Sequence, residues 1–407
     1  MNDNRFDNIE EQEEHRETSS LNLRADCNIE YIFTSGRGAR ALGVIVIVLF
    51  IGILLSFLVN FGVSAYLGSE ELVDNYYDEQ DHPNIILSDF ADTFYLSEKI
   101  RKNITSVDYY LFRRLPTDSV LLGKDEFLFP TYNEKSNYNY VADYLGELDL
   151  NSDELNAYYT AVLDITAEYE KYGIACYFAI IPNSQTVYSD RMPGYMGNIS
   201  EETRLKSVSA YLARRGVTNF LDLTDALKRA RSEGELYNNT EDSLNSRGAY
   251  YAYLAVLDML PRELNTKIRR IYLSDSDFVL HSTTGKELAR TATLENVIKN
   301  RTVSLSTDFV QKYQVLLRYD TYDMAFAKMQ YQDELPDQPR IAVQFSSDWD
   351  RIIMIDYFSN TFGTAIYRTS LDFNTQVITK TDPAYVICFI HERDLASIAD
   401  GSMLPKK

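Results

Sequence analysis

Apolar residues are distributed along this chain in distinct patterns, and the longest run predicts a membrane segment. No charged residue occurs from Ala41 to Val59, and the apolar character continues less strictly to Leu67. About 20 such residues are what an α-helix needs to cross the ~30 Å hydrocarbon core of a bilayer. We therefore expect residues 41–67 to form a single transmembrane helix.

The charges that flank this run predict its orientation. Arg37 and Arg40 precede it, and acidic residues follow it closely. Because a basic flank stays in the cytoplasm, we expect residues 1–40 to be an acidic cytoplasmic tail and the C-terminal part to be extracellular. The alternative is a cleaved signal peptide, since Val63-Ser64-Ala65 resembles a cleavage site.

Beyond the membrane segment, helical and extended patterns alternate. Apolar residues at helical spacing predict a helix over residues 155–169, and the apolar run 174–181 follows directly, closing in Pro182-Asn183. Such a run bounded by turn signals is typical of a strand buried in a parallel sheet. Further strands are expected at residues 218–222, 340–345, 363–367 and 385–390, and further helices at 201–215, 250–260 and 350–361. These alternating units predict a doubly wound α/β sheet.

Two regions lack this alternation. Residues 68–115 mix acidic residues with some apolar periodicity, which predicts an extracellular stalk. Residues 266–339 show short strand-like stretches at 270–273, 302–305 and 313–318 and a helical stretch at 286–299. We expect an inserted, irregular lobe with antiparallel strands there, between the two parts of the sheet domain, residues 116–265 and 340–407.

The charge and the cysteines narrow the function and the compartment. A formal charge of −20, spread along the chain, argues against nucleic acid and polyanions as partners and suits a neutral glycan or simple solubility. Cys27 lies in the expected cytoplasmic tail, so Cys176 and Cys388 are the remaining candidates for an external disulfide. Both lie in apolar strands, where the geometry of a disulfide is rarely met, so we expect two buried free thiols.

The stretch from Asn239 to Tyr253 has an informative order of residues. It resembles the segment that names the DHHW proteins and their relatives, the AlgX/AlgJ-type SGNH-hydrolase-like proteins. Those proteins work with membrane O-acyltransferases to acetylate secreted polysaccharides. The family segment reads roughly Thr-Asp-x-His-Trp and continues, a few residues later, with Gly-Ala and a helix. The positions that keep this frame are Thr240, Asn245, Arg247, Gly248 and Ala249.

The same alignment implies that the catalytic positions of the family are altered. Glu241 replaces its Asp, Ser243 its catalytic His, and Leu244 its Trp. The frame has a structural use without catalysis, because Asn245 or Ser246 can cap the helix that follows. The resemblance therefore implies a degenerate member of the family.

Three further blocks follow the family's order, so that the resemblance covers about residues 117–400. Gly123-Lys124-Asp125 resembles the hairpin that opens the globular domain, Pro182-Asn183 a Pro-Asn-Lys loop, and Glu392-Arg393-Asp394-Leu395 a Glu-Arg-x-Leu ending. The resemblance makes Asn183, Asn245 and Arg247 candidates for substrate binding. Asn183 equally suits a plain turn.

A nucleophile and its base are the remaining catalytic positions. When the strand ending at Phe345 sets the register, Ser347 matches the family's nucleophilic serine; when the next helix sets it, Trp349 falls there instead. A serine needs a neighbouring base to accept its proton. Of the four histidines, His391 is the candidate for a replacement base, because it ends a strand where α/β sites gather. The alternative is a histidine with a structural role.

No motif indicates a cofactor, and the adjacent Glu241 and Asp242 lack a third ligand at metal-binding spacing. The leading hypothesis is a membrane-anchored, catalytically degenerate accessory or binding protein in cell-surface polysaccharide modification or export. Its expected partners are a membrane-bound O-acyltransferase or a glycan synthase, and a neutral polysaccharide. Two alternatives stay open: an active serine-dependent O-acetyltransferase or esterase, and a structural envelope protein without a glycan.

Overall fold

The computed structural model describes most of the chain beyond residue 96. The described residues are 48, 50–52, 55, 97–265, 267–313, 315–321, 324–329, 339–362, 364–375, 378 and 382–405. The chain divides into two compact units, residues 1–103 and 104–407, and most of the described residues belong to the second. The expected transmembrane segment, residues 41–67, lies outside the described residues apart from a few positions. Among the described residues, no helix combines the length and the apolar character needed to span a bilayer.

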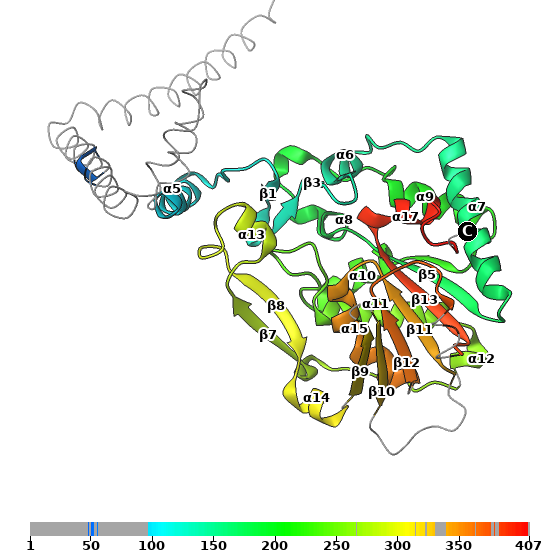
Figure 1. Ribbon diagram of the computed structural model, residues 1–407. Coiled ribbons are helices and arrows are strands. Elements are labelled where there is room, and N and C mark those ends of the chain that lie inside the picture. Colours follow the sequence, from blue (N-terminus) through cyan, green and yellow to red (C-terminus); the bar gives the residue numbers. More distant parts are fainter. Residues whose placement is uncertain are drawn as a thin grey trace, which may run out of the picture. The chain divides into compact units, whose positions relative to one another are not determined.

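A seven-stranded sheet forms the centre of the second unit (Figure 1). Its strands, in spatial order, are β6 (Phe220–Asp222), β5 (Ala175–Ile181), β13 (Tyr385–His391), β11 (Ile341–Phe345), β12 (Thr364–Arg368), β10 (Met324–Met329) and β9 (Val315–Thr321). The first five run parallel, while β10 and β9 are antiparallel to their neighbours. The α/β fold with a parallel central sheet is therefore confirmed.

The strand register aligns the carboxyl ends of three strands. Ile181 of β5 lies opposite His391 of β13, and Phe389 of β13 lies opposite Phe345 of β11. The residues that follow β5 and β11 are therefore brought beside the end of β13. This edge is where a parallel sheet gathers polar side chains from distant parts of the sequence.

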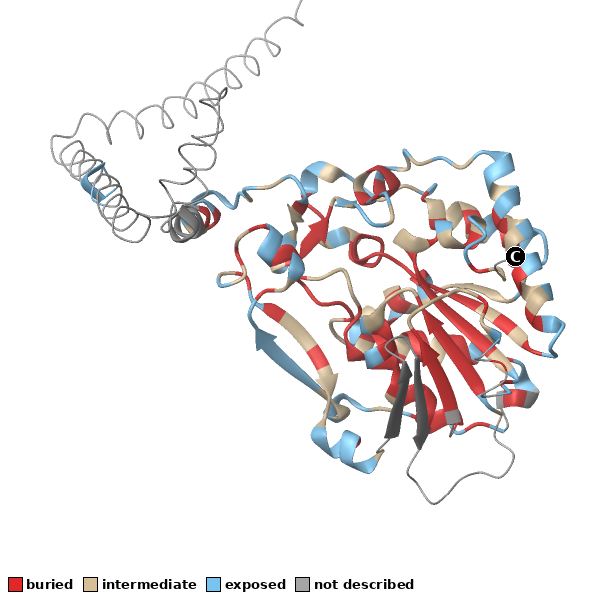
Figure 2. Ribbon diagram, viewed as in Figure 1, coloured by how far each residue is buried: buried red, intermediate tan, exposed pale blue. Residues whose placement is uncertain are grey.

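Helices cover the sheet on both faces. Apolar side chains of α10 (Thr224–Ala230), α11 (Ser246–Met259) and α15 (Asp348–Phe362) form one core with one face of the strands. Those of α7 (Ser152–Glu170), α9 (Arg204–Arg214) and α17 (Ala396–Ala399) form a second core with the other face. Along β5, Ala179 and Ile181 enter the first core, and Phe178 and Ile180 the second, as the alternation of a strand requires. The middle residues of β5, β13, β11 and β12 are buried, while β6 is half-buried (Figure 2).

Capping and turn residues set the helix boundaries. Asn151 caps α7 in a reciprocal box with Glu154, and Gly173 turns the chain into β5 with a positive φ of 72°. Asn245 caps α11 by accepting a hydrogen bond from the backbone N of Gly248, which confirms one of the two caps expected there. A Cβ at Gly248 would lie 2.1 Å from the carbonyl oxygen of Leu236, so the frame requires glycine at this position.

The structure describes further helices and strands. They are α5 (Ser97–Phe112), β1 (Val120–Leu122), η1 (Lys124–Glu126), β2 (Leu128–Pro130), β3 (Tyr132–Asn133), β4 (Tyr138–Asn139), α6 (Tyr140–Leu145), α8 (Ser184–Val187), η2 (Ser189–Arg191), η3 (Gly194–Met196), η4 (Arg231–Glu233), α12 (Arg262–Asn265), η5 (Asp275–Asp277), β7 (Phe278–Thr283), α13 (Glu287–Thr291), β8 (Asn300–Leu305), α14 (Thr307–Lys312) and η6 (Glu392–Asp394). The expected opening hairpin is the antiparallel pair of β1 and β2.

Residues 266–339 differ in part from the expected separate lobe. β7 and β8 form an antiparallel hairpin of their own, but β9 and β10 extend the central sheet beyond β12. The stretch 270–273 is not a strand, because the hydroxyl groups of Tyr253 and Tyr250 accept the backbone N–H groups of Ile271 and Leu273 in place of a neighbouring strand. The helix expected over residues 286–299 is limited to α13.

Both thiols expected in the sheet are free and buried. Cys176 lies on β5 opposite Val386 of β13, and Cys388 follows two residues later on β13, so the two cysteines are diagonal neighbours. Burial, and next to it the neighbouring Cys388, raises the pKa of the Cys176 thiol well above its ordinary value. The expectation of two unpaired, buried thiols is confirmed.

Candidate functional site

Five ionisable side chains gather at the carboxyl ends of the parallel strands, and we call them the strand-end cluster. They are Asp242, Asp350, His391, Glu392 and Arg393. His391 is the last residue of β13, the next two residues follow it in η6, and Asp350 lies in the first turn of α15. Asp242 comes from the loop that precedes α11. The cluster therefore combines three separate segments of the chain at the edge where α/β proteins bind ligands.

Asp242 and Arg393 form its first ion pair. An Nη1–Oδ2 distance of 2.8 Å joins them, and the same Oδ2 accepts the hydroxyl of Tyr140 at 2.9 Å. The backbone N of Ser184 donates to Oδ1 at 3.1 Å. Burial alone would raise the pKa of Asp242, but the electrostatic effect of Arg393, followed by that of His391, and these hydrogen bonds lower it below its ordinary value. Asp242 is therefore an ionised, fully satisfied carboxylate.

Arg393 is correspondingly fixed in its charged form. Burial would lower its pKa, but Tyr140, Asp242 and the other acidic groups around it raise it above the ordinary value. Arg393 Nη1 also donates to the carbonyl oxygen of Asp242 at 3.1 Å. This pairing attaches the loop before α11 to the end of β13.

Glu392 is buried next to Arg393 but has a different charge state. Its Oε2 accepts the backbone N of Asn183 at 2.7 Å and the hydroxyl of Thr186 at 3.0 Å. Burial, followed by the negative charges of Asp143 and Asp222, raises the pKa of Glu392 to about 8. At neutral pH this side chain is mainly a protonated carboxyl group, which can donate a hydrogen bond. Among the described residues, its Oε1 atom has no hydrogen-bond partner.

Asn183 links Glu392 to the segment around α6. Its side-chain Nδ2 donates to the hydroxyl of Tyr138 at 2.9 Å, and Tyr138 in turn donates to Asp143. The other oxygen of Asp143 accepts the backbone N of Arg204 at 2.7 Å. The Oδ1 atom of Asn183 is buried and without a hydrogen-bond partner in the described part of the chain. Asn183 is thus both a turn residue and a member of the polar network at this edge.

His391 and Asp350 form a second buried pair. The Nε2 of His391 lies 2.6 Å from the Oδ2 of Asp350, and both side chains are 1% exposed. Within the described residues, neither ring nitrogen of His391 is hydrogen-bonded to a serine hydroxyl. At this edge the described residues therefore supply a histidine with a carboxylate beside it, but the ring of His391 is not paired with a serine.

The two serines after β11 have different surroundings. The backbone N of Ser346 donates to the carbonyl oxygen of Phe389 at 3.0 Å, and its Oγ accepts the backbone N of His391 at 3.1 Å. Ser346 is therefore used to continue the contact between the two strands. Ser347 is the first residue beyond it, half-buried, and its carbonyl oxygen accepts the backbone N of Arg351 at the start of α15. Of the two, Ser347 is the better placed for a nucleophile.

Ser243 stands where the sequence comparison placed a catalytic histidine. Its Oγ accepts the side-chain amide of Asn238 at 2.9 Å, and its carbonyl oxygen accepts the backbone N of the same residue at 3.0 Å. Glu241 Oε2 lies 3.3 Å from that amide. Burial raises the pKa of Glu241, so this carboxylate is not stabilised by a strong partner. In the part of the chain that the structure describes, Ser243 and Glu241 therefore share one asparagine, and neither is hydrogen-bonded to a histidine.

Asn245 and Arg247 are engaged outside the cluster. Asn245 is fully buried and caps α11, and its Nδ2 donates to the carbonyl oxygen of Glu235 at 2.8 Å. Arg247 pairs with Asp275 at 3.1 Å and lies over the ring of Phe278. The structure therefore brings Ser347, His391 and Asn183 to the strand ends but gives Asn245 and Arg247 packing and capping contacts.

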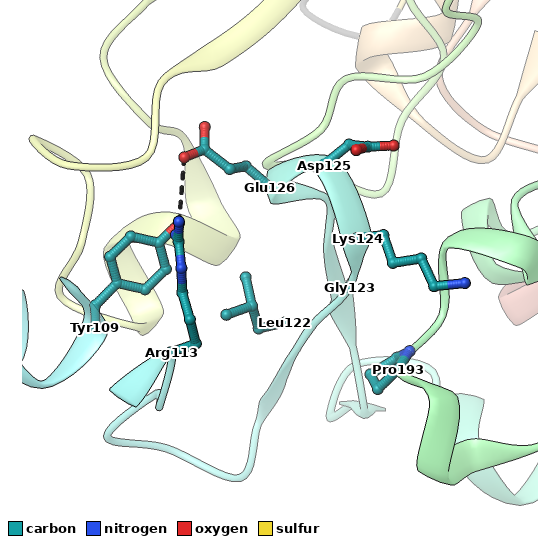
Figure 3. Close-up of a pocket in the computed structure, with 8 residues that line it drawn as sticks. All are labelled: Tyr109, Arg113, Leu122, Gly123, Lys124, Asp125, Glu126 and Pro193. Carbon is teal, nitrogen blue, oxygen red and sulfur yellow. Dashed lines mark hydrogen bonds between the residues drawn. The ribbon is translucent and has the colours of Figure 1, made fainter. Parts of the chain in front are cut away.

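A separate cavity of about 400 Å³ lies at the opening hairpin (Figure 3). It is lined by Tyr109, Arg113, Leu122, Gly123, Lys124, Asp125, Glu126 and Pro193. The hydroxyl of Tyr109 donates to Glu126 across it at 3.3 Å. No member of the strand-end cluster lines this cavity. In the described part of the chain, no group of three or more His, Cys, Asp or Glu side chains is arranged to hold a metal ion.

Three functional residues of the cluster were not identified from the sequence. In the sequence, Asp350 is one of several acidic residues in an expected helix. Only the pairing of β11 with β13 places it beside His391. Asp242 was considered as the neighbour of Glu241, whereas its partner is Arg393, 151 positions away. Glu392 belonged to a recognised block, and its signal was a carboxylate directly after an apolar strand.

Part of the chain matches a known protein family. Residues 120–321 match the family described as the SGNH hydrolase-like domain of the acetyltransferase AlgX. Among curated proteins, no sequence is significantly similar to the chain.

Several solved structures match this chain but share little sequence with it. The O-acetyltransferase domain of Pseudomonas putida AlgJ is 13% identical, over 70% of this chain and 99% of that one, with a TM-score of 0.45. Bacillus cereus PatB1 with a sulfonyl adduct is 12% identical, over 69% and 96%, with a TM-score of 0.47. A DHHW family protein from Eubacterium siraeum is 13% identical, over 64% and 92%, with a TM-score of 0.45. On this match, residues 120–321 of the chain form an AlgX-type SGNH hydrolase-like domain.

Proposed function

We propose that this protein is a catalytically degenerate member of its family that binds a cell-surface polysaccharide and assists its modification or export. One observation carries the proposal. In the described residues, neither ring nitrogen of His391 is hydrogen-bonded to a serine, so the candidate nucleophile Ser347 has no base bound to its hydroxyl. Ser243, at the family's histidine position, is held by Asn238.

The physical argument concerns proton transfer. A serine hydroxyl becomes a useful nucleophile only when a neighbouring base takes its proton, and the members of such a triad act as a unit. A hydroxyl such as that of Ser243 cannot take up a proton near neutral pH. The charged groups at the strand ends are instead paired with one another, as in Asp242 with Arg393, which stabilises the loops around the edge. A rigid polar edge at which, among the described residues, the ring of His391 is not hydrogen-bonded to a serine suits binding.

One observation favours a second function, an active serine-dependent O-acetyltransferase or esterase. His391 and Asp350, 2.6 Å apart, are a histidine and an orienting carboxylate at the correct end of the sheet. In that case Ser347 Oγ would attack an acyl carbonyl while His391 accepts the proton. Catalytic hydrogen bonds often tighten only when substrate is bound. Turnover of an acetyl ester therefore decides between the two functions.

The test is an assay of the purified protein on an activated acetyl ester and on O-acetylated oligosaccharides. The variants are Ser347→Ala and His391→Ala, with Ser276→Ala, an exposed serine in η5, as the matched control. We expect all four proteins to show the same low background rate. Turnover that Ser347→Ala abolishes and Ser276→Ala leaves intact would establish the enzyme. Loss of turnover in His391→Ala as well would identify His391 as the base.

The proposal includes a location and partners. We propose that residues 41–67 anchor the protein in the cell membrane with residues 1–40 in the cytoplasm, and that a membrane-bound O-acyltransferase or a glycan synthase acts beside it. Protease added to spheroplasts should digest the C-terminal domain, and full protection of that domain would contradict this topology. The third alternative, a structural envelope protein, predicts no binding of any oligosaccharide.

A further inference from the structure

The single tryptophan of the chain, Trp349, lies at the same edge of the sheet and is partly exposed. It occupies the first turn of α15, two residues after Ser347. Its indole Nε1 donates to the carbonyl oxygen of Leu244 at 2.7 Å, and 39% of the residue is exposed. The hydrogen bond satisfies the only polar atom of the ring and fixes its orientation, so the part of the ring that faces solvent is aromatic surface.

Two neighbouring residues of α15 are also exposed. Ile352, three residues later and on the same side of the helix, is 51% exposed. Asp348, directly before the tryptophan, has a side chain that is 45% exposed. Its Oδ1 accepts the hydroxyl of Thr369 at 2.9 Å and pairs with Arg351, so that the carboxylate is held in place. The surface thus combines fixed apolar area with a fixed hydrogen-bond acceptor.

This combination matches the two kinds of surface on a sugar ring. One face of a pyranose carries C–H groups and is apolar, while its edge carries hydroxyl donors. The C–H groups are slightly positive and are attracted to the negative face of an aromatic ring. A carboxylate accepts hydroxyl hydrogen bonds strongly. A ring whose orientation is already fixed loses little conformational entropy when a ligand stacks on it.

The charges near the tryptophan select between classes of polysaccharide. Asp348 and the formal charge of −20 repel a polyuronate and leave a neutral chain unaffected. We propose that Trp349 is a stacking platform for a sugar ring of a neutral polysaccharide, with the carboxylate of Asp348 accepting a hydroxyl of the same chain. This inference rests on the proposed function and names the ligand class of the same edge.

The experiment uses the intrinsic fluorescence of the full-length protein, because one tryptophan reports on one place. The probes are neutral oligosaccharides of glucose, galactose, mannose and N-acetylglucosamine, with and without O-acetyl groups, and an oligouronate as the anionic comparison. Calorimetry gives the affinities of Trp349→Ala and Asp348→Asn. Tyr272→Ala removes an exposed aromatic residue elsewhere on the surface and is the matched control.

We expect at least one neutral probe to change the tryptophan emission, and its affinity to fall about tenfold in Trp349→Ala and less in Asp348→Asn. The oligouronate should not bind. The control variant Tyr272→Ala should bind the neutral probe with unchanged affinity. If Trp349→Ala has lost its fold by circular dichroism, Trp349→Phe, which keeps an aromatic ring, should retain more affinity than Trp349→Leu.

Two results would overturn the inference in different ways. Unchanged affinity for a neutral oligosaccharide in Trp349→Ala would refute the platform but leave the proposed function standing. Failure of every neutral oligosaccharide to bind the wild-type protein would refute both. Tighter binding of the oligouronate than of any neutral probe would refute the assignment of the ligand class.

Discussion

The interior of the central sheet and the strand-end cluster are neighbours with opposite chemistry. In the interior, Phe345 and Phe389 stack with ring centroids 5.4 Å apart and are fully buried. Two residues further along β13, His391 is equally buried but faces a carboxylate. The interior is stabilised by apolar area and close packing, and the edge by charge pairs that compensate for lost hydration. Equal burial therefore has different energetic consequences in the two regions.

The largest effect is expected in the interior. Phe389→Ala should lower the free energy of unfolding by about 3–5 kcal/mol, because the change removes transfer energy and leaves a cavity in the first core. Urea denaturation of the purified protein measures it. Phe389→Leu keeps most of the volume and should cost clearly less. A loss below about 1 kcal/mol in the alanine variant would show that the apolar interior does not dominate stability.

At the edge, Arg393→Met should cost about 3 kcal/mol, because Asp242 is left buried without its partner. The cost is smaller than in the interior because the remaining carboxyl can take up a proton. The pKa of Asp242 is lowered in the folded state. The pair therefore contributes fully to the free energy of unfolding above the ordinary pKa of an aspartate, and this contribution is lost as the pH falls through the lowered value.

A double variant separates the pair from its parts. Asp242→Asn combined with Arg393→Met should recover at least half of the loss, because no isolated charge remains. Denaturation of the wild-type protein and the three variants at neutral pH forms a double-mutant cycle. Additive losses would mean that the two residues act independently, and the comparison between interior and edge would lose its physical basis.

Glu392→Gln tests the protonation state within the cluster. The folded pKa is raised to about 8, so between about 4.5 and 8 the unfolded chain loses a proton that the folded protein keeps. Stability should therefore be greatest below the unfolded pKa and fall, by up to about 1.4 kcal/mol per pH unit, as the pH rises through this window. The glutamine variant should show a flatter profile and greater stability near pH 8.

Asp356→Asn provides the matched control for this pH dependence. Burial raises the pKa of Asp356 to about 6, so this variant should flatten the profile only below that pH. Measuring the midpoint of urea denaturation across the pH range distinguishes the two residues. An unchanged slope between pH 6 and 8 in Glu392→Gln would mean that Glu392 is ionised in the folded protein.

The same contrast explains how far the sequence predicts the structure. The strands β5, β11 and β13 were predicted because apolar runs record burial locally, residue by residue. The cluster was predicted only in part, because the pairing of Asp242 with Arg393 depends on strand order and register, which no local pattern records. His391 could be predicted as a site residue because it lies at the end of a strand. Its partner Asp350 could not, because their pairing depends on the position of α15 relative to β13.

The stretch 270–273 shows a second limit. Its residues have the composition of a strand, but the hydroxyls of Tyr250 and Tyr253 take the hydrogen bonds that a neighbouring strand would make. The rings of both tyrosines are buried on α11. Their hydroxyls determine the backbone of a segment about 20 residues further on, and this tertiary effect outweighs the local strand propensity.

The smallest effect is expected at Asn245, where two roles predict different results. As the N-cap of α11 it accepts a hydrogen bond from Gly248, so Asn245→Ala should cost about 1 kcal/mol of stability, and Asn245→Asp, which keeps the accepting oxygen, should cost less. As a substrate-binding residue it would instead change affinity for oligosaccharides. Because the side chain is fully buried and also donates to Glu235, we expect affinity to stay within twofold, roughly 0.4 kcal/mol, in both variants. Denaturation and calorimetry on the same preparations measure both quantities. A loss of affinity without a loss of stability would assign Asn245 to the binding edge and extend that edge beyond the strand-end cluster.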